Sequence, residues 1–257
     1  MDKIEVSLAL LKSFFEKQNI QFWLEAGTAL SAEREGRVFP WEHDIDVAIW
    51  RHDLPDLKLL ESFFSEQGYK VIFQKNYPYI DNIIQLKAIN GYEDKLFDID
   101  IYLYARYQGH AYMRWIHKPE GRLAALKLRT LSILKYLVNP TTDKWKRISR
   151  FLPSSLSRAM FFWFLRFYVN HSTCIYHRFP EKYFLDFKEI EFHGNKVKIP
   201  SDTDNYLQHR YGPNWKTPDS QFNQTGKWKQ SGARVELDMK LLPLPVYDDR
   251  IIVGNAE

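Results

Sequence analysis

The sequence predicts an α+β fold in which a mixed sheet carries flanking helices and is joined to a mainly helical, basic lobe. Five segments have the alternating or continuously apolar pattern of strands: residues 21–26, 44–50, 70–74, 80–88 and 96–104. Residues 1–19 and 54–68 have the periodicity of amphipathic helices. A helical pattern returns at residues 122–138 and at about 155–176, and it is rich in Lys and Arg there.

The chain is expected to comprise three parts: a catalytic core over residues 1–110, a basic helical lobe over residues 111–180, and an α/β segment over residues 181–257 that completes the same globule. Residues 104–180 carry 14 Lys and Arg against 2 Asp and Glu, although the net charge of the chain is only +4. This excess favours anionic partners such as nucleotide phosphates, acidic glycans or lipid headgroups. A solvated basic face would carry the same charge.

The composition points to a folded protein that depends on packing. With 257 residues, 45% hydrophobic and 16% aromatic, the chain can bury a full core. Its single cysteine, Cys174, excludes an internal disulfide and a thiolate zinc site. The N-terminal segment lacks the apolar run of a signal peptide, and Arg166 interrupts the longest apolar run, which is shorter than the ~20 residues of a membrane span. We therefore expect a cytoplasmic protein without a signal peptide or transmembrane helix.

Two aspartates in the second predicted strand indicate a cation site. Asp44 and Asp46 are two residues apart, so both carboxylates lie on one face, about 7 Å from each other. The other face holds Ile45, Val47 and Ile49. Oxygen ligands of this kind suit Mg²⁺ or Mn²⁺ and phosphoryl chemistry. A surface strand also alternates charged and apolar residues, so the pair alone is a weak signal.

A second pair of aspartates strengthens that signal. Asp98 and Asp100 are embedded in an apolar segment, and buried carboxylates are costly unless they are paired or bind metal. If this strand lies beside the first, Asp98 or Asp100 completes a three-carboxylate cluster. Asp44 and Asp46 would then hold the metal, while the third aspartate binds a second metal or accepts the proton of an attacking hydroxyl. A solvated strand face is the structural alternative.

Gly27 and Thr28 stand where the first strand turns into a short helix. A glycine lets a phosphate approach the backbone, and a helix N-terminus directs N–H groups and a positive dipole end at it. Thr28 would cap this helix or bond a phosphate oxygen. Arg34 lies later in the same helix, where its guanidinium is placed to bind a diphosphate with two hydrogen bonds. An ion pair of Arg34 with a neighbouring glutamate is the alternative.

The segment Phe22–Trp50 resembles the signature of the LicD/fukutin family, roughly W-L-x-x-G-T/S-x-L-x-x-x-R-x-G-x-x-I-P-W-D-x-D-I/V-D. The residues that coincide with this pattern are Leu24, Gly27, Thr28, Leu30, Arg34, Gly36, Pro40, Trp41, Asp44 and Asp46. The later family strand is similar to Asp100-Ile101-Tyr102, and its C-terminal element is similar to Phe192–Trp215. In that element, Tyr211, Gly212 and Trp215 form a structural corner or an aromatic wall for a base or sugar.

The resemblance implies a nucleotidyltransferase-type fold and a Mg²⁺- or Mn²⁺-dependent reaction. A phospho-alcohol, such as phosphocholine or ribitol phosphate, would move from a CDP-linked donor to a glycan or lipid-linked glycan. Glu42 stands where the family has aspartate; it keeps the charge, adds a methylene and is expected among the metal ligands. His43 beside it is expected to be a solvated neighbour. Lys87 is expected to neutralise phosphate charge, although an exposed strand lysine would look the same.

The apolar segment 160–165 lies between Arg158 and Arg166, a combination typical of helices in a lipid interface. Contact with a membrane surface would suit a lipid-linked acceptor, whereas a hydrophobic helix in the lobe's own core explains the pattern equally well. No nucleic acid partner is expected.

Three other functions stay open at this point. An enzyme that transfers NMP from an NTP to a small molecule needs the same carboxylates. A glycosyltransferase can hold a nucleotide sugar with Asp-x-Asp, but only 43 residues precede Asp44, less than the ~100 residues of the usual nucleotide-binding half. A scaffold or peripheral membrane protein could keep the fold without activity.

Overall fold

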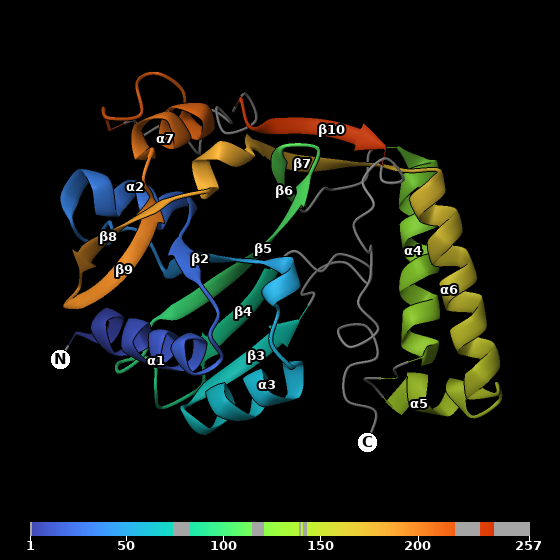
Figure 1. Ribbon diagram of the computed structural model, residues 1–257. Helices are drawn as coiled ribbons and strands as arrows, with labels where there is room; N and C mark the ends of the chain where they lie inside the picture. Colours follow the sequence, from blue (N-terminus) through green and yellow to red (C-terminus); the bar gives the residue numbers. More distant parts are fainter. Residues whose placement is uncertain are drawn as a thin grey trace. The chain divides into compact units, whose positions relative to one another are not determined.

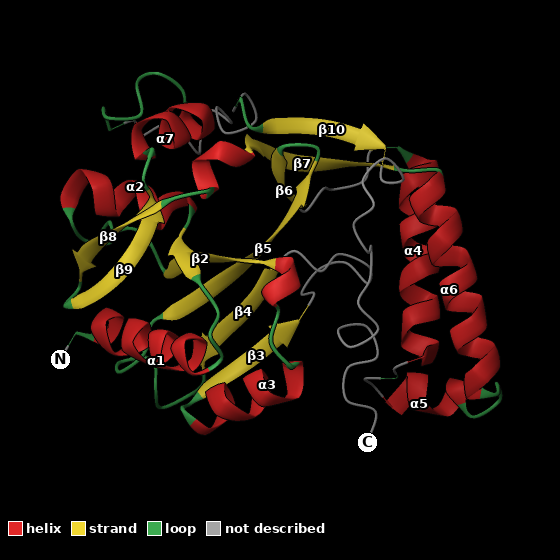
Figure 2. Ribbon diagram, in the orientation of Figure 1, coloured by secondary structure: helices red, strands yellow, loops and turns green. Residues whose placement is uncertain are grey.

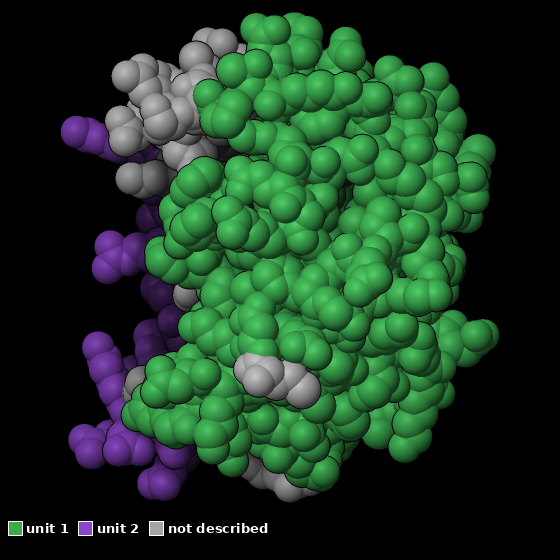
Figure 3. Space-filling view, turned by 90° about the vertical axis from the view of Figure 1, so that its left-hand side faces the viewer, with its two compact units in different colours: residues 1–73, 82–113, 176–235 green, residues 74–81, 114–175, 236–257 purple. Residues whose placement is uncertain are grey.

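The computed structural model describes the chain in six stretches: residues 2–73, 83–114, 121–138, 140, 143–218 and 232–238. The chain forms two compact units (Figure 3). The first unit consists of Met1–Phe73, Asn82–Met113 and Tyr176–Val235. The second unit consists of Gln74–Asp81, Arg114–Ile175 and Glu236–Glu257. The first unit thus combines most of the predicted core with residues from the predicted C-terminal segment.

Within the described stretches, eight strands form one mixed sheet (Figure 1). They are β1 (Phe22–Leu24), β2 (Asp44–Trp50), β3 (Tyr69–Phe73), β4 (Ile83–Ala88), β5 (Asp98–Tyr107), β6 (His110–Arg114), β7 (Thr173–Pro180) and β10 (Arg234–Asp238). The order is β1-β2-β5-β6-β7-β10, and β4 pairs with both β3 and β5. β2 and β5 run parallel, whereas β1–β2, β3–β4, β4–β5 and β5–β6 are antiparallel. The prediction of an α+β fold with a mixed sheet is confirmed.

Four helices belong to the first unit: α1 (Lys3–Lys17), α2 (Ala26–Glu35), α3 (Leu57–Glu66) and α7 (Thr203–Tyr211). Leu8, Leu11 and Phe15 recur at helical spacing in α1 and are fully buried, and Asp2 caps this helix by accepting from the N–H of Ile4. A separate hairpin pairs β8 (Phe187–Phe192) with β9 (Asn195–Pro200). Trp23 of β1 is fully buried and packs against the aromatic rings of Trp50, Tyr104, Phe184 and Phe187.

The strands that carry the aspartates lie where the sequence predicts them. The predicted strand 44–50 coincides with β2, and the predicted strand 96–104 overlaps β5. β4 and β5 form an antiparallel pair, and the chain turns between them at Asn90-Gly91, a dipeptide typical of hairpin turns. Residues 80–82, predicted as the start of the preceding strand, lie outside the described stretches, as does Gln74.

The second unit contains α4 (Arg122–Val138), α5 (Asp143–Ser149) and α6 (Ser154–Asn170) (Figure 2). α4 and α6 contact each other, and Lys127 of α4 donates from Nζ to the carbonyl of His171 at 3.0 Å. The predicted helix over about 155–176 is too long, because Thr173–Tyr176 form the start of β7. This short segment of β-branched and aromatic residues suits a strand better than a helix. Among the described helices, none has both the length and the hydrophobicity to cross a bilayer.

Candidate active site around the paired aspartates

The parallel pairing of β2 with β5 aligns the two Asp-x-Asp motifs residue for residue. Asp44 is the partner of Asp98, and Asp46 is the partner of Asp100. Ile45, between the aspartates of β2, is fully buried on the opposite face. Because neighbouring strands lie about 4.8 Å apart and side chains alternate, all four carboxylates share one face at the same end of the two strands. β5 therefore lies beside β2, which is the condition on which the predicted carboxylate cluster depends.

The two aspartates of β5 have different surroundings. Asp98 accepts from the N–H of Ala88 at 2.9 Å and pairs with Lys87 at 3.0 Å between Oδ2 and Nζ. Asp100 is buried and accepts from Nε2 of Gln85 at 2.9 and 3.0 Å, with Nζ of Lys87 4.0 Å from Oδ1. Asp98 is thus bound to Lys87 and to the backbone of β4, whereas Asp100 is held by the side-chain amide of Gln85.

Lys87 lies against the carboxylates of β5. Burial acts to lower the pKa of Lys87, but the hydrogen bond to Asp98 and the negative charge of Asp100 prevail and raise it. Lys87 therefore stays charged and partly offsets the cluster. Its predicted contact with donor phosphate stays a prediction.

The ionised form of Asp46 is strongly disfavoured by its surroundings. Burial, followed by the charges of Asp44 and Asp100, raises the pKa of Asp46 well above its usual value, and the positive charge of Arg210 opposes the rise. Burial and Asp44 also raise the pKa of Glu42, with His43 acting in the opposite direction. Carboxylates held in this state favour the approach of a cation.

The N-terminus of α2 faces these carboxylates through Gly27. A Cβ at this position would lie 3.3 Å from Oε1 of Glu42 and 3.5 Å from Oδ2 of Asp46. The preceding residue, Ala26, has a left-handed backbone with φ +48°, and its N–H donates to the hydroxyl of Tyr206 at 3.3 Å. Such a conformation costs about 1–3 kcal/mol for a residue other than glycine and is often retained at ligand sites. The absence of a Cβ at Gly27 lets the carboxylates of Glu42 and Asp46 lie close to the backbone of α2.

Thr28 does not cap the helix. α2 begins at Ala26, earlier than predicted, and its N-cap is Glu25, whose side chain forms no capping hydrogen bond. Thr28 is buried, and its Oγ1 accepts from the N–H of Asp46 at 2.8 Å. This bond fixes the first turn of α2 to the strand that carries Asp44 and Asp46.

Two charged residues that sequence reasoning missed lie beneath the site. Glu25 is fully buried and accepts from Trp23, from Tyr104 at 2.8 Å, and from the guanidinium of Arg210 in α7. Arg210 is also buried, and its charge acts on Asp46. Glu25 could have been noticed as a glutamate directly after an apolar strand, but nothing in the sequence indicates that Arg210 is its partner.

Arg34 and Trp215, which the sequence predicts at the site, contact other residues of the protein, as does the neighbouring Arg37. Arg34 lies 5.0 Å over the ring of Phe39, and Arg37 pairs with Glu35 at 3.9 Å. The binding of diphosphate by Arg34 stays a prediction. Trp215 is buried, which agrees with a structural corner after α7.

A divalent cation fits the chemistry of this donor set. Among the described residues, no three His, Cys, Asp or Glu side chains converge as a closed metal site requires. Mg²⁺ usually retains waters and is bound through one or two carboxylates together with substrate phosphates. Asp44 and Asp46 supply such a pair, and Asp100 would be a further oxygen ligand on the adjacent strand.

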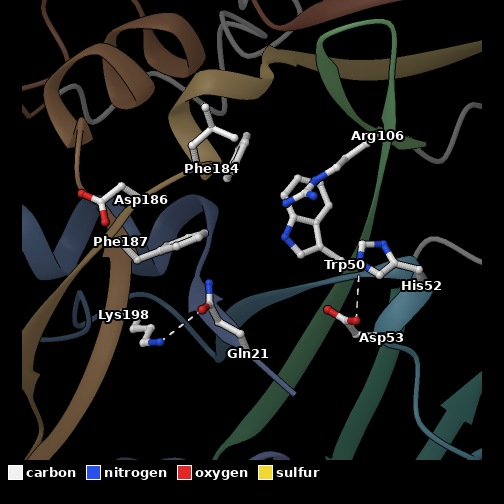
Figure 4. A pocket seen from close by; sticks show the side chains of 10 residues that line it. Gln21, Trp50, His52, Asp53, Arg106, Phe184, Asp186, Phe187 and Lys198 are labelled. Atoms are coloured by element: carbon white, nitrogen blue, oxygen red, sulfur yellow. Dashed lines mark hydrogen bonds and ion pairs between the residues drawn. The ribbon is translucent and has the colours of Figure 1, made fainter. Parts of the chain in front are cut away.

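A separate cavity lies at the opposite ends of β2 and β5 (Figure 4). It has a volume of about 420 Å³ and is lined by Trp50, Arg106 and Lys198 among others. Arg106 lies 4.1 Å over the ring of Trp50 and pairs with Glu181 at 3.3 Å, while Lys198 donates to Gln21 at 3.2 Å. The cations in its wall thus already have partners.

Comparison with known proteins identifies relatives of the region that holds the site. Residues 19–125 match the family model described as LicD/FKTN/FKRP, nucleotidyltransferase domain. Uncharacterized protein RP689 of Rickettsia prowazekii (strain Madrid E) is 34% identical over 61 residues, 24% of this chain and 23% of that protein. Ribitol 5-phosphate transferase FKRP of Homo sapiens is 32% identical over 59 residues, 21% of this chain and 12% of that protein. The matched segment spans less than a quarter of each relative.

Two solved structures also resemble the chain. The lincosamide antibiotic adenylyltransferase LnuA, bound to lincomycin, aligns with 90% of this chain and 99% of its own, at 13% identity and a TM-score of 0.41. ANT(2")-Ia in complex with adenylyl-2"-tobramycin aligns with 64% of this chain and 98% of its own, at 14% identity and a TM-score of 0.30.

Proposed function

We propose that this chain, whose residues 19–125 match the LicD/FKTN/FKRP family model, is a metal-dependent transferase for phospho-alcohols. The group transferred is phosphocholine, ribitol phosphate or a similar group, the donor is CDP-linked, and the acceptor is a glycan hydroxyl. The observation that supports this most is the pairing of Asp44 with Asp98 and of Asp46 with Asp100, next to the N-terminus of α2. This arrangement supports the proposal because it would bring cation ligands, a proton acceptor and a helix end suited to phosphate together.

The proposed reaction is an in-line displacement at the phosphorus that carries the alcohol. The acceptor oxygen forms a bond to this phosphorus, the anhydride bond to CMP breaks, and CMP leaves with the bonding electrons. Asp100 accepts the hydroxyl proton, and its bond to Gln85 holds the carboxylate in position for this role. A Mg²⁺ or Mn²⁺ ion held by Asp44 and Asp46 would supply neutralisation of the phosphate charge.

The remaining contributions come from the polypeptide. The N-terminal turn of α2 would face the donor phosphates, and the missing side chain of Gly27 would allow them to approach its backbone. Lys87 adds positive charge on the β5 side of the cluster. These fixed dipoles and charges stabilise the transition state without rearranging during the reaction.

Calorimetry with CDP-choline, CDP-ribitol and CDP-glycerol, each with and without Mg²⁺ or Mn²⁺, tests the proposal. At least one donor is expected to bind in a metal-dependent manner, and Asp46→Ala is expected to abolish this binding. Asp143→Ala is the matched control, because the Asp143 side chain is 97% exposed and lies in the second unit. Failure of all three donors to bind, or full binding by Asp46→Ala, would contradict the proposal.

Nucleotidyl transfer from an NTP is the second candidate, because the matched domain is described as a nucleotidyltransferase domain and the same carboxylates serve both reactions. The mass of the product separates the two. An acceptor that gains a phospho-alcohol supports our proposal, whereas an acceptor that gains NMP supports the alternative.

A further inference from the structure

Helix α6 has two apolar stripes, and the fold of its unit buries only one of them. Phe161, Leu165 and Tyr168 are buried. The second stripe contains Leu156, Met160, Trp163 and Phe167, which are 46%, 41%, 70% and 38% exposed. Their spacing of i, i+4, i+7 and i+11 places them on one face of the helix. We call these four residues the exposed stripe.

Two residues before α6 are exposed and apolar as well. Phe151, between α5 and α6, is 85% exposed, and Ile148 in α5 is 37% exposed. Within the stripe, the rings of Trp163 and Phe167 stack with centroids 6.3 Å apart. Exposed apolar side chains that share one helix face, as in the exposed stripe, mark an interaction surface, whereas isolated ones do not.

The charge of the same unit selects the kind of partner. Residues 121–175 contain ten Lys and Arg and one acidic residue, Asp143. The exposed basic residues are Arg122, Arg129, Lys144, Lys146, Arg147, Arg150, Arg158 and Arg166. Two units with this excess of positive charge would repel each other, whereas an anionic surface would attract either one.

We propose that α5 and α6 dock on an anionic lipid bilayer, with Phe151 and the exposed stripe inserted among the headgroups. Aromatic residues beside Lys and Arg are the pattern of helices that lie in the interface, where apolar burial and attraction to anionic lipid act together. α5 and α6 belong to the second unit and the carboxylate cluster to the first, and the proposal does not depend on the chemistry of that cluster.

Co-sedimentation of the full chain with phosphatidylcholine vesicles, with and without phosphatidylglycerol, tests this docking. Binding is expected to require phosphatidylglycerol and to weaken with salt. In the double variant Arg150→Gln/Arg166→Gln, affinity is expected to fall about 25-fold, since each basic residue near the surface contributes about fivefold. The double variant Phe151→Ser/Trp163→Ser is expected to lose at least tenfold.

Leu185→Ser is the matched control, because Leu185 is 69% exposed but belongs to the first unit. Its binding should equal that of the wild type, and circular dichroism should show that all variants are folded. The proposal is overturned if the wild type does not bind phosphatidylglycerol vesicles or if Phe151→Ser/Trp163→Ser binds them equally well. It is also overturned if light scattering shows a dimer that this variant dissociates, because a second copy would then cover the stripe.

Discussion

Asp46 and Asp100 lie opposite each other on adjacent parallel strands, and each is preceded two residues earlier by another aspartate. Four carboxylates on one face of a sheet repel one another, and the raised pKa of Asp46 records this repulsion together with its burial. Lys87 and Arg210 offset part of the charge. An arrangement that lowers stability in this way is typical of sites that bind a cation or move a proton.

Replacement of Asp46 by Asn is expected to stabilise the protein at neutral pH. The folded-state pKa of Asp46 lies above its unfolded value of about 3.9. Stability of the wild type therefore falls as the pH rises from the unfolded pKa through the folded one. Because Asn carries no charge at any pH, Asp46→Asn does not undergo this loss of stability. A gain of about 1 kcal/mol would raise the melting temperature by about 2–4 °C for a chain of this size.

Melting curves of the wild type and Asp46→Asn between pH 4 and pH 8 provide the measurement. The difference should be small at the acidic end and grow toward neutral pH. Asp143→Asn, at an exposed position, should follow the wild type. A constant difference across the pH range would show that the charge of Asp46 is not the cause.

The wild type and Asp46→Asn are expected to differ in how much a divalent metal stabilises them. Mg²⁺ or Mn²⁺ at 100 times its dissociation constant would stabilise the wild type by about 2.7 kcal/mol if it binds only the folded state. Asp46→Asn should lose most of this effect, since one of the proposed ligands is gone. The melting temperatures of both proteins are measured in chelator and in added metal. An equal rise in melting temperature would show that the metal binds elsewhere.

The strands were predictable from the sequence, because β2 and β5 alternate polar and apolar residues and period 2 is a local property. Their register was not predictable in the same way. The pairing of Asp46 with Asp100 depends on which strands become neighbours, and this is decided by packing across the whole sheet. The sequence therefore indicated a third carboxylate without deciding between Asp98 and Asp100.

Errors in the predicted helices have local physical causes. Thr28 has the chemistry of an N-cap, but α2 begins at Ala26 because a left-handed residue turns the chain there. The contact between Glu25 and Arg210 joins residues far apart in the chain, so no local pattern announces it.

Asp100 and Asp98 are expected to differ in their effect on catalysis. Asp100→Asn should lower kcat by about 10²–10⁴-fold, the usual contribution of a general base, while donor binding is retained. Asp98→Asn is the control at the adjacent position, because Asp98 is bound to Lys87 and to the N–H of Ala88. It should affect kcat by less than about tenfold. Steady-state kinetics measure kcat of the two variants. A larger loss of kcat in Asp98→Asn than in Asp100→Asn would assign the general base to Asp98.

Gly27→Ala is expected to weaken donor binding and leave the fold intact. The added Cβ would meet Glu42 at 3.3 Å and Asp46 at 3.5 Å, within the space where a phosphate would approach the helix. Alanine is favoured over glycine inside a helix by about 1 kcal/mol, so stability should not fall. Calorimetry with the CDP-linked donor, next to a melting curve, separates the two effects. Unchanged affinity would exclude phosphate from this side of α2.

The buried pair of Glu25 and Arg210 is expected to hold α7 against the turn between β1 and α2. Both side chains are buried, so removal of one partner leaves an uncompensated charge and typically costs 3–5 kcal/mol. Arg210→Met and Glu25→Gln should each lower the free energy of unfolding by about this amount. The double variant should lose less than the sum of the two.

Urea denaturation of the three variants measures this coupling, and a surface pair provides the comparison. Lys188 and Glu33 are 3.0 Å apart with side chains 40% and 30% exposed, so Lys188→Met should cost less than about 1 kcal/mol. The charge of Arg210 also opposes the rise in the pKa of Asp46. Arg210→Met should therefore raise that pKa further and shift the acidic limb of the pH–rate profile upward. If Arg210→Met lowers stability but leaves the profile unchanged, the role of the pair is confined to packing.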